Sequence, residues 1–395
     1  MNQPDLRLPA VDHLQKRSLL VGIVALLLCG AGAVSNPPEF FHAYLTAYLF
    51  WIGVALGCLA VLMLHHLVSG RWGFAIQRLL ESGSRTLPLM AVLFVPLLFG
   101  LRELFLWARP EAVAAQAILR HRQPYLNTPF FFARLILYFF VWILLASLLS
   151  KWSWEQDRTA AADLTRRQRM LSGPGLVLYG VTVTFAAFDW VMTLGPQWHS
   201  TVFGAVFIVG QGLAALCVMV LVSSWLAKRG PLGTVMSPQN FHDLGNLILA
   251  FVMLWAYLAF SQYLIIWSGN IPDEIPWYVS RMAGQWLWVA MFLITFHFAV
   301  PFLLLLSRVT KRRAEILVGV AVGLLLMRMV DLFYIVAPAF HPGHISIHWM
   351  DLLAPIGIGG IWLWMFLHQL QGKSLLPLND PRFVGASGHA HGTVP

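Results

Sequence analysis

The sequence predicts an all-α polytopic membrane protein with about ten transmembrane helices, and two observations predict it. Of the 395 residues, 58% are hydrophobic and only 11% are charged. About a quarter of the residues in a soluble domain are charged, so this chain has too few charges to cover a water-facing surface. In addition, apolar runs of about 20 residues, the length that crosses the hydrocarbon core as a helix, recur along the whole chain. Together these features exclude a soluble enzyme, a disordered chain and a nucleic-acid-binding protein.

Ten apolar segments define the expected order of the spans. They lie at 18–35, 41–68, 85–107, 129–151, 173–194, 200–228, 240–268, 276–307, 312–337 and 348–370. The first resembles a cleavable signal peptide, because Lys16 and Arg17 precede it and Ala31-Gly-Ala33 ends it. We expect it to be retained as a span. Residues 1–17 are expected to form a cytoplasmic N-terminus, 152–171 a cytoplasmic extension of the fourth helix, and 371–395 a flexible cytoplasmic tail.

The lysines and arginines indicate the orientation of the spans. Of the 26 basic residues, 19 fall in one set of alternate connections and three in the other. The positive-inside rule places the basic connections, and both termini with them, in the cytoplasm. The remaining four arginines lie within spans.

The cysteines and histidines show no metal-binding pattern. Cys29, Cys58 and Cys217 lie in apolar runs without CxxC spacing, so we interpret them as buried hydrophobic residues and predict no metal site. No CxxCH motif is present for covalent haem. A b-type haem held by His66 and His297 is the main cofactor alternative, because such a haem needs two facing histidines at similar depth.

Spans 2–5 (41–194) and 6–9 (200–337) read as two copies of one four-helix bundle, with 18–35 and 348–370 as flanking spans. Each copy opens near a histidine that a glycine follows eleven residues later, and each later carries one arginine and one acid in the same order. An even number of helices gives both copies the same orientation, which makes the repeat parallel. The corresponding pairs are His42 and His199, Gly53 and Gly210, Arg134 and Arg281, and Asp189 and Asp331.

Polar side chains within the spans are the candidate functional residues, because an ionisable group in the bilayer is costly unless it is paired or hydrated. They form two groups. The outer cluster contains Arg102, Glu103, Arg134, Asp189, His199, Gln262, Arg281, Gln285, Arg328 and Asp331. The inner cluster, a candidate proton path from the cytoplasm, contains His65, His66, His242, Asp243, Asn246 and His297.

Two interpretations of these clusters stay open at the level of sequence. Arg134 with Asp189, or Arg328 with Asp331, can be buried ion pairs that lock helices together, and His242 and Asp243 can be helix caps. Alternatively, an aspartate or histidine beside an arginine supplies the hydrogen-bond and proton-accepting groups that a quinol headgroup requires near the membrane surface.

Several longer motifs resemble a known family. They are Ser237-Pro-Gln-Asn-Phe-His-Asp-Leu-Gly-Asn246, Ala259-Phe-Ser-Gln-Tyr-Leu-Ile-Ile-Trp267, Gly269-Asn-Ile-Pro-Asp-Glu-Ile-Pro-Trp-Tyr278, Phe188-Asp-Trp-Val-Met-Thr-Leu194 and Trp198-His-Ser-Thr-Val-Phe-Gly204. These segments resemble the ActF-type quinone-binding membrane subunits of alternative complex III, within the wider NrfD and polysulfide reductase membrane-subunit family. The resemblance covers nearly the whole chain, and it implies two four-helix bundles with flanking helices.

The resemblance also implies a function. It places the chain in the bacterial inner membrane, in a quinol:cytochrome c oxidoreductase with a sister NrfD-like (ActC-like) subunit, an iron–sulfur subunit and c-type cytochrome subunits. Quinone or menaquinone is then the expected ligand, while haem and iron–sulfur clusters are expected only in the partner subunits, so the chain is not catalytic alone. A stand-alone secondary transporter that uses the buried acids and a purely structural membrane anchor are the alternatives.

Overall fold

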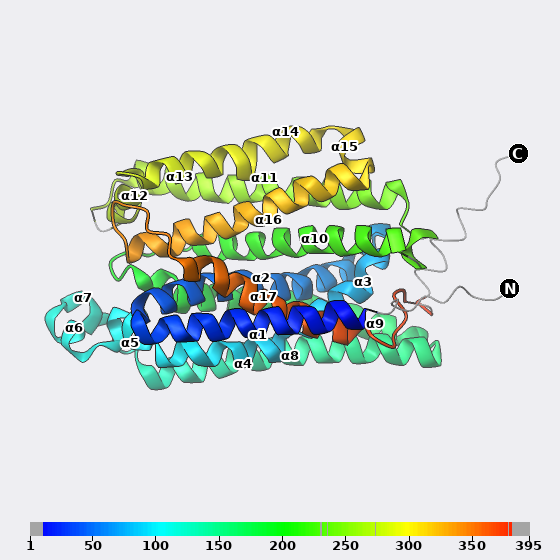
Figure 1. Cartoon of the computed structure of the whole chain (residues 1–395), viewed down its shortest axis with the longest axis horizontal. Coiled ribbons are helices and arrows are strands. Elements are labelled where there is room, and N and C mark those ends of the chain that lie inside the picture. Colours follow the sequence, from blue (N-terminus) through cyan, green and yellow to red (C-terminus); the bar gives the residue numbers. More distant parts are fainter. Residues whose placement is uncertain (1–10, 230, 235, 273, 378, 381–395) are drawn as a thin grey trace, which may run out of the picture.

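The computed structural model describes residues 11–229, 231–234, 236–272, 274–377 and 379–380, which form a bundle of helices running along one direction (Figure 1). Within this part of the chain, ten helical segments are long and apolar enough to cross a membrane, and there is no strand element. These segments are Asp12–Ser35, Pro37–Val68, Trp72–Phe99, Thr128–Thr159, Ala162–Leu194, Phe203–Arg229, Pro238–Gly269, Trp286–Leu306, Ala314–Ala339 and Trp349–Leu370. The predicted all-α polytopic membrane fold is therefore confirmed.

Most spans are single helices, and two spans are divided into shorter helices. The helices that form the spans are α1 (Asp12–Ser35), α2 (Pro37–Val68), α3 (Arg71–Ser84), α4 (Leu87–Phe99), α8 (Thr128–Thr159), α9 (Ala162–Trp190), α10 (Phe203–Arg229), α11 (Pro238–Gly269), α13 (Trp286–Leu293), α14 (Val300–Leu306), α16 (Ala314–Val336) and α17 (Trp349–Leu370). Short helices connect them: α5 (Leu101–Leu104), η1 (Leu106–Ala108), α6 (Pro110–Ala115), α7 (Ala117–Arg122), η2 (Met192–Leu194), η3 (Pro231–Thr234), α12 (Ile275–Met282), α15 (Arg308–Arg312) and η5 (Ala337–Ala339).

The two ends of the bundle carry different elements (Figure 1). We call the end with α5, α6, α7 and α12 the outer end, following the predicted orientation, and the opposite end, with α15, the inner end. The first and last described segments meet at the inner end, where Gln371 Nε2 donates to Asp12 Oδ1 at 3.2 Å and to Gln15 Oε1 at 2.8 Å. An even number of spans requires both ends of the chain to lie on one side. That this side is the cytoplasm stays a prediction.

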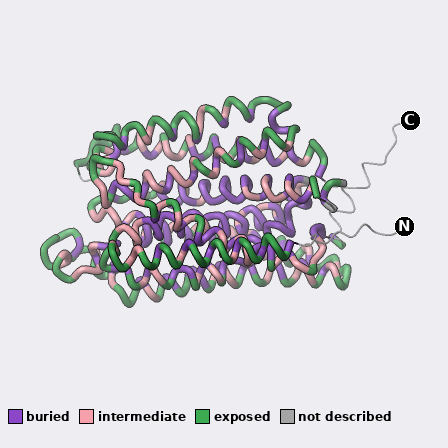
Figure 2. Tube along the Cα trace, in the orientation of Figure 1, coloured by how far each residue is buried: buried purple, intermediate pink, exposed green. Residues whose placement is uncertain are grey.

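Helices α2 and α10 form the centre of the bundle. They pack against each other, and α9, α16 and α17 pack around them; Figure 2 shows the buried residues concentrated along this central layer. The two helices approach closely because Gly57 has no side chain. A Cβ at this position would lie 2.0 Å from the backbone oxygen of Gln211. Small residues at such crossings are how membrane helices gain close backbone packing.

The remaining contacts fall into two groups of helices. On one side of the central layer α2, α4, α8 and α9 pack together, and on the other α10, α11, α14 and α16 do. Helices α1 and α17 pack along each other. That the two groups are copies of one unit stays a prediction.

The connection expected at 69–85 is instead the helix α3, and this prediction was wrong. Residues Trp72–Phe99 form one span that α3 and α4 share. Arg78 and Glu81 in α3 are buried, and their charges make α3 less apolar than the helices of the other spans. Because they pair with each other, the helix can bury them.

The span expected at 276–307 is also discontinuous. It is divided into α12, a break at Ala283–Gln285 in which Gly284 has φ +60°, and the span Trp286–Leu306. Within that span, residues Ile294–Ala299 form a π-helix. Pro301 follows it and lacks the N–H that would bond the carbonyl of His297, which explains the local change of helix type.

Two expectations for the inner end are corrected. The stretch 152–171 is not one extension of the fourth helix, because α8 ends at Thr159 and α9 begins at Ala162. The first part of the expected flexible tail is packed: Leu375 and Leu376 are buried, and Asn379 Nδ2 donates to the carbonyl of Asp157 at 2.8 Å. These apolar and amide contacts hold residues 371–377 and 379–380 against the bundle, while 378 and 381–395 lie outside the described residues.

Candidate functional site

A buried ion pair joins α8 to α9 within the first half. Arg134 donates through Nε and Nη2 to the two carboxylate oxygens of Asp189, at 2.8 and 2.9 Å. The Tyr138 hydroxyl also donates to Asp189, at 2.8 Å. Both charged side chains are buried, and two parallel bonds are the strongest geometry for an arginine and a carboxylate. The pair is thus neutral and fixed, as expected of a contact that locks two helices together.

The corresponding acid of the second half has a different partner. Asp331 pairs with Arg328, three residues earlier on the same helix α16, and both are buried. The corresponding position of α9 is Ala186, so the first half has no such arginine. Arg328 fits because Gly210 of α10 faces it: a Cβ there would lie 2.3 Å from the guanidinium carbon.

Arg281, which the repeat aligns with Arg134, is consequently left without a carboxylate partner among the described residues. It lies on α12 and is only 4% exposed. Its Nη1 donates to the carbonyl of Trp277 at 3.0 Å, and its Nη2 to the carbonyl of Ile335 at 2.7 Å. Nη1 also donates to the Ser280 hydroxyl at 3.5 Å. A guanidinium carries five N–H donors, so two remain, among them the one on Nε. Burial lowers the pKa of Arg281 to about 9.

Arg281 lines a cavity of about 360 Å³ at the outer end. Its other walls come from η2 and the loop that follows, from α12 and from η5, with a cover from the α6–α7 connection. Trp277 lies flat under the guanidinium at 3.8 Å and stacks on Trp198 at 4.4 Å between ring centroids. The lining residues are Leu106, Gln116, Val191, Leu194, Gly195, Pro196, Gln197, Trp198, Phe203, Pro276, Trp277, Ser280, Arg281, Ile335, Pro338 and Ala339. A volume of a few hundred Å³, aromatic walls and fixed polar groups are features that small-molecule sites share.

Five other members of the outer cluster do not line this cavity. Gln262 accepts from Ser200 at 3.0 Å and donates to the Tyr278 hydroxyl at 3.0 Å. His199 lies 3.1 Å from Glu274. Gln285 holds the backbone N–H of Ile345 at 2.8 Å, away from the cavity lining. Arg102 and Glu103 are exposed on α5.

The inner cluster is divided between two places. His242, Asp243 and Asn246 lie together on the first turns of α11, where Lys311 of α15 donates to Asn246 Oδ1 at 2.7 Å. The Lys311 ammonium is a site residue that the sequence analysis missed, because it belongs to a basic connection. Burial lowers its pKa.

Three histidines of the inner cluster, His65, His66 and His297, are deeply buried. His65 and His66 are adjacent on α2, with ring centroids 5.7 Å apart. His297, in the π-helix, stacks on Trp255 of α11 at 4.1 Å. The haem pairing of His66 with His297 stays a prediction.

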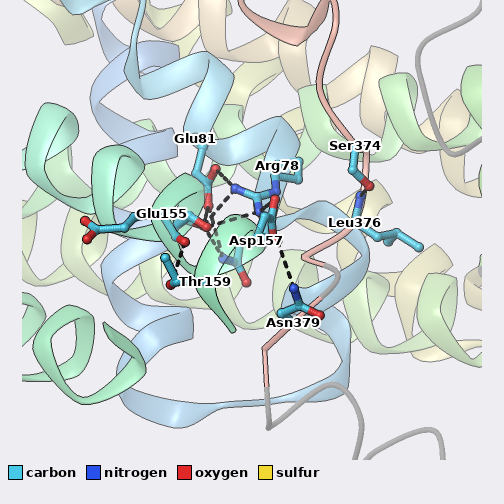
Figure 3. A network of polar contacts seen from close by, with 10 residues as sticks. Arg78, Glu81, Glu155, Asp157, Thr159, Ser374, Leu376 and Asn379 are labelled. Atoms are coloured by element: carbon cyan, nitrogen blue, oxygen red, sulfur yellow. Dashed lines mark hydrogen bonds and ion pairs between the residues drawn. The ribbon is translucent and has the colours of Figure 1, made fainter. Parts of the chain in front are cut away.

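A polar network at the inner end was not predicted at all. Figure 3 shows Arg78 and Glu81 of α3 meeting Asp157 of α8. Arg78 Nη1 donates to Glu81 at 2.7 Å and to Ser153 Oγ at 2.8 Å, and its Nη2 pairs with Asp157. Ser153 donates to Glu81 at 2.6 Å. The i,i+3 spacing of Arg78 and Glu81 in a segment with helical periodicity was the available signal.

The C-terminal segment covers this network. The Lys373 ammonium lies 3.5 Å from the ring centroid of Trp154, on α8. Burial, together with the positive charge of Arg85, lowers the pKa of Lys373 to about 8. The network and its cover therefore tie α3, α8 and the end of the chain together.

No protein-family model matches the chain, and no curated protein matches it either.

Proposed function

We propose that this chain is an integral membrane subunit of a respiratory quinol:cytochrome c (or other acceptor) oxidoreductase, and that the Arg281 cavity receives the quinone headgroup. The observation that carries the proposal is a buried arginine with no counter-ion among the described residues, in a cavity with aromatic walls. The proposal also rests on the resemblance of the sequence to the ActF-type membrane subunits.

The chemistry of the cavity suits a quinone. The remaining N–H donors of Arg281 can bond a quinone carbonyl or a quinol oxygen, and a cation there stabilises the oxygen as it loses its proton. The stacked indoles of Trp198 and Trp277 offer flat apolar walls for the ring. At the outer surface next to these residues, His199 and Glu274 form a proton-accepting couple.

Quinol oxidation also needs an electron acceptor, which the proposal assigns to other chains. The sequence has no CxxC or CxxCH motif for a cluster or covalent haem. The electrons would pass to the iron–sulfur subunit and then to the c-type cytochromes, beside a sister NrfD-like subunit. The lipid bilayer is the remaining partner, and the predicted membrane is the bacterial inner membrane.

The buried ion pairs have a positional role in this proposal. Asp189 and Asp331 each hold an arginine, so neither acid is placed as an unpaired proton carrier. This favours the subunit over a transporter that cycles those acids.

The experiment is to purify the protein with its native partners and to compare Arg281→Gln and Arg281→Lys with the unchanged chain. A charged hydrogen bond is worth about 1.5–3 kcal/mol, so Arg281→Gln should lower quinone occupancy about 10- to 100-fold, with partial rescue by Arg281→Lys. Arg120→Gln, on exposed α7 at the same end, is the matched control. Unchanged quinone content and KM for quinol in an assembled Arg281→Gln complex would exclude this cavity. Purification as a homo-oligomer without haem or iron would exclude the complex.

A further inference from the structure

A second group of side chains at the outer end comes from three distant parts of the sequence. Glu39 and His42 lie on the first turns of α2, and His341 lies in the connection between η5 and α17. One donor atom from each lies within 4.8 Å of the other two. His341 Nε2 is 3.2 Å from Glu39 Oε1. Two imidazoles and a carboxylate that converge in this way form a metal-ligand set.

The geometry allows a small ion between these groups. Ligand atoms about 2.0–2.2 Å from a tetrahedral Zn²⁺ lie roughly 3.3 Å from each other. The 3.2 Å between His341 and Glu39 already matches that edge, while the donor atom of His42 lies within 4.8 Å of both. The His42 ring rests on Phe340 at 3.5 Å between centroids, and its buried Nδ1 has no hydrogen-bond partner among the described residues.

A small cavity lies at the point of convergence. It measures about 10 Å³, the room that a single water molecule or ion occupies. Its lining is Glu39, His42, Thr46, Phe333, Val336, Ala337, His341, Ser346 and Asp351. This lining holds two carboxylates and neither lysine nor arginine.

We propose that Glu39, His42 and His341 bind one divalent transition-metal ion of the zinc class, and that Asp351 supplies the fourth donor. Nitrogen and oxygen ligands of this kind suit Zn²⁺. Asp351 lines the same small cavity, and one of its oxygens accepts from the backbone N–H of His348 at 2.8 Å at the start of α17, which leaves the other oxygen for the ion. The sequence analysis predicted no metal site because the ligands do not share a spacing motif and come together only in the fold.

The ion would act as a structural clip. It would join the start of α2 to the 341–348 connection, and this connection supports the break before α13: the carbonyl of His341 accepts from Trp286 Nε1 at 3.0 Å. The carbonyl of Gly343 accepts from the backbone N–H of Gln285 at 3.4 Å. The clip is independent of the quinone proposal, since none of its ligands lines the Arg281 cavity.

The test is zinc binding by the purified full chain, without a histidine tag and with the tail residues His389 and His391 replaced by alanine. After chelation, the protein is dialysed against micromolar Zn²⁺ and its metal content is measured. One equivalent is expected, and Co²⁺ substitution should give the absorption of a tetrahedral site. His341→Gln should lower the affinity for Zn²⁺ at least tenfold, and Asp351→Asn about 10- to 100-fold.

The controls separate ligation from folding. His121→Gln, on exposed α7 at the same end, should retain the full equivalent. His42→Gln changes a residue inside α2 and can disturb that helix. His341→Gln removes a ligand from a connection, so it tests metal binding while α2 is unchanged. Retention of one tight equivalent by both His341→Gln and His42→Gln, or less than a tenth of an equivalent in the starting protein, would overturn the proposal.

Discussion

Replacing Asp189 by asparagine should be among the most destabilising single changes in this protein. The carboxylate accepts two bonds from Arg134 and one from the Tyr138 hydroxyl, at 2.8–2.9 Å. Asparagine keeps one acceptor oxygen and turns an amide N–H₂ toward a guanidinium that is itself only a donor. Arg134 then stays buried without a counter-ion. Removing one partner of a buried ion pair costs about 3–5 kcal/mol, and we expect a loss of that size here.

The measurement is the free energy of unfolding in mixed detergent micelles, followed by tryptophan fluorescence. Asp163→Asn is the matched control, because Asp163 pairs with Arg167 at 2.8 Å, but both side chains are more than half exposed. An exposed i,i+4 pair is worth less than about 1 kcal/mol. If Asp189→Asn costs no more than this control, the ion pair does not lock α8 to α9.

A double-mutant cycle tests the same reasoning from the other side. Arg134→Met combined with Asp189→Leu removes both charges, and such a replacement of a buried pair is often close to neutral. We expect the double variant to cost at least about 2 kcal/mol less than the sum of the single variants. Additive losses would mean that the two side chains act independently.

Three further changes test other parts of the structure. Gly210→Ala should displace Arg328, whose guanidinium carbon lies 2.3 Å from the new Cβ, and should cost about 1–3 kcal/mol of unfolding free energy. Trp51→Phe should remove the bond from the indole to the carbonyl of Pro355 at 2.8 Å and cost about 1 kcal/mol; an exposed tryptophan changed to phenylalanine should cost nothing measurable. Burial and a neighbouring arginine lower the pKa of Lys373 to about 8, below its unfolded value of about 10.4. The unfolded segment then binds more protons between these values, so protection of the 371–380 segment from proteolysis should rise from pH 8 to pH 10, and Lys373→Met should remove the rise.

The number and type of spans could be predicted because each depends on local composition. A membrane helix satisfies its own backbone hydrogen bonds, so about 20 apolar residues suffice to identify it. The same criterion failed where charges are compensated by distant partners. Arg78 and Glu81 made α3 look like a connection, although Asp157 of α8 pairs with Arg78 and Ser153 of α8 hydrogen-bonds to both residues. Long-range pairing cannot be read from a window of sequence.

In the candidate site, too, only part of the arrangement could be predicted from the sequence. The sequence placed Arg134, Asp189, Arg281 and Asp331 in one outer cluster, since depth along a helix follows from position in the chain. The two pairs that the sequence suggested, Arg134 with Asp189 and Arg328 with Asp331, are both present and buried. The environment of Arg281, in contrast, depends on how the helices and connections pack against each other, which no window of sequence shows. The cavity beside Arg281 is formed largely by loops and short helices, whose geometry no periodicity predicts.

The different pairing of the arginines in the two halves of the chain explains why Arg281 has hydrogen-bond donors left for a ligand. In the first half Arg134 and Asp189 satisfy each other. In the second half, Arg328 pairs with Asp331. Arg281 donates instead to the carbonyl of Ile335, which lies four residues, or about one helical turn, after Asp331 on α16. Arg328→Ala should therefore let Asp331 draw Arg281 toward it.

Because Asp331 would then pair with Arg281, Arg328→Ala should lose less than about 3 kcal/mol of unfolding free energy. Arg134→Ala leaves Asp189 unpaired and should lose about 3–5 kcal/mol. Quinone occupancy should fall in Arg328→Ala and stay unchanged in Arg134→Ala variants that fold. Equal losses of stability in the two variants, with quinone binding intact in both, would show that Arg328 does not free Arg281. The asymmetry between the halves would then have no bearing on ligand binding.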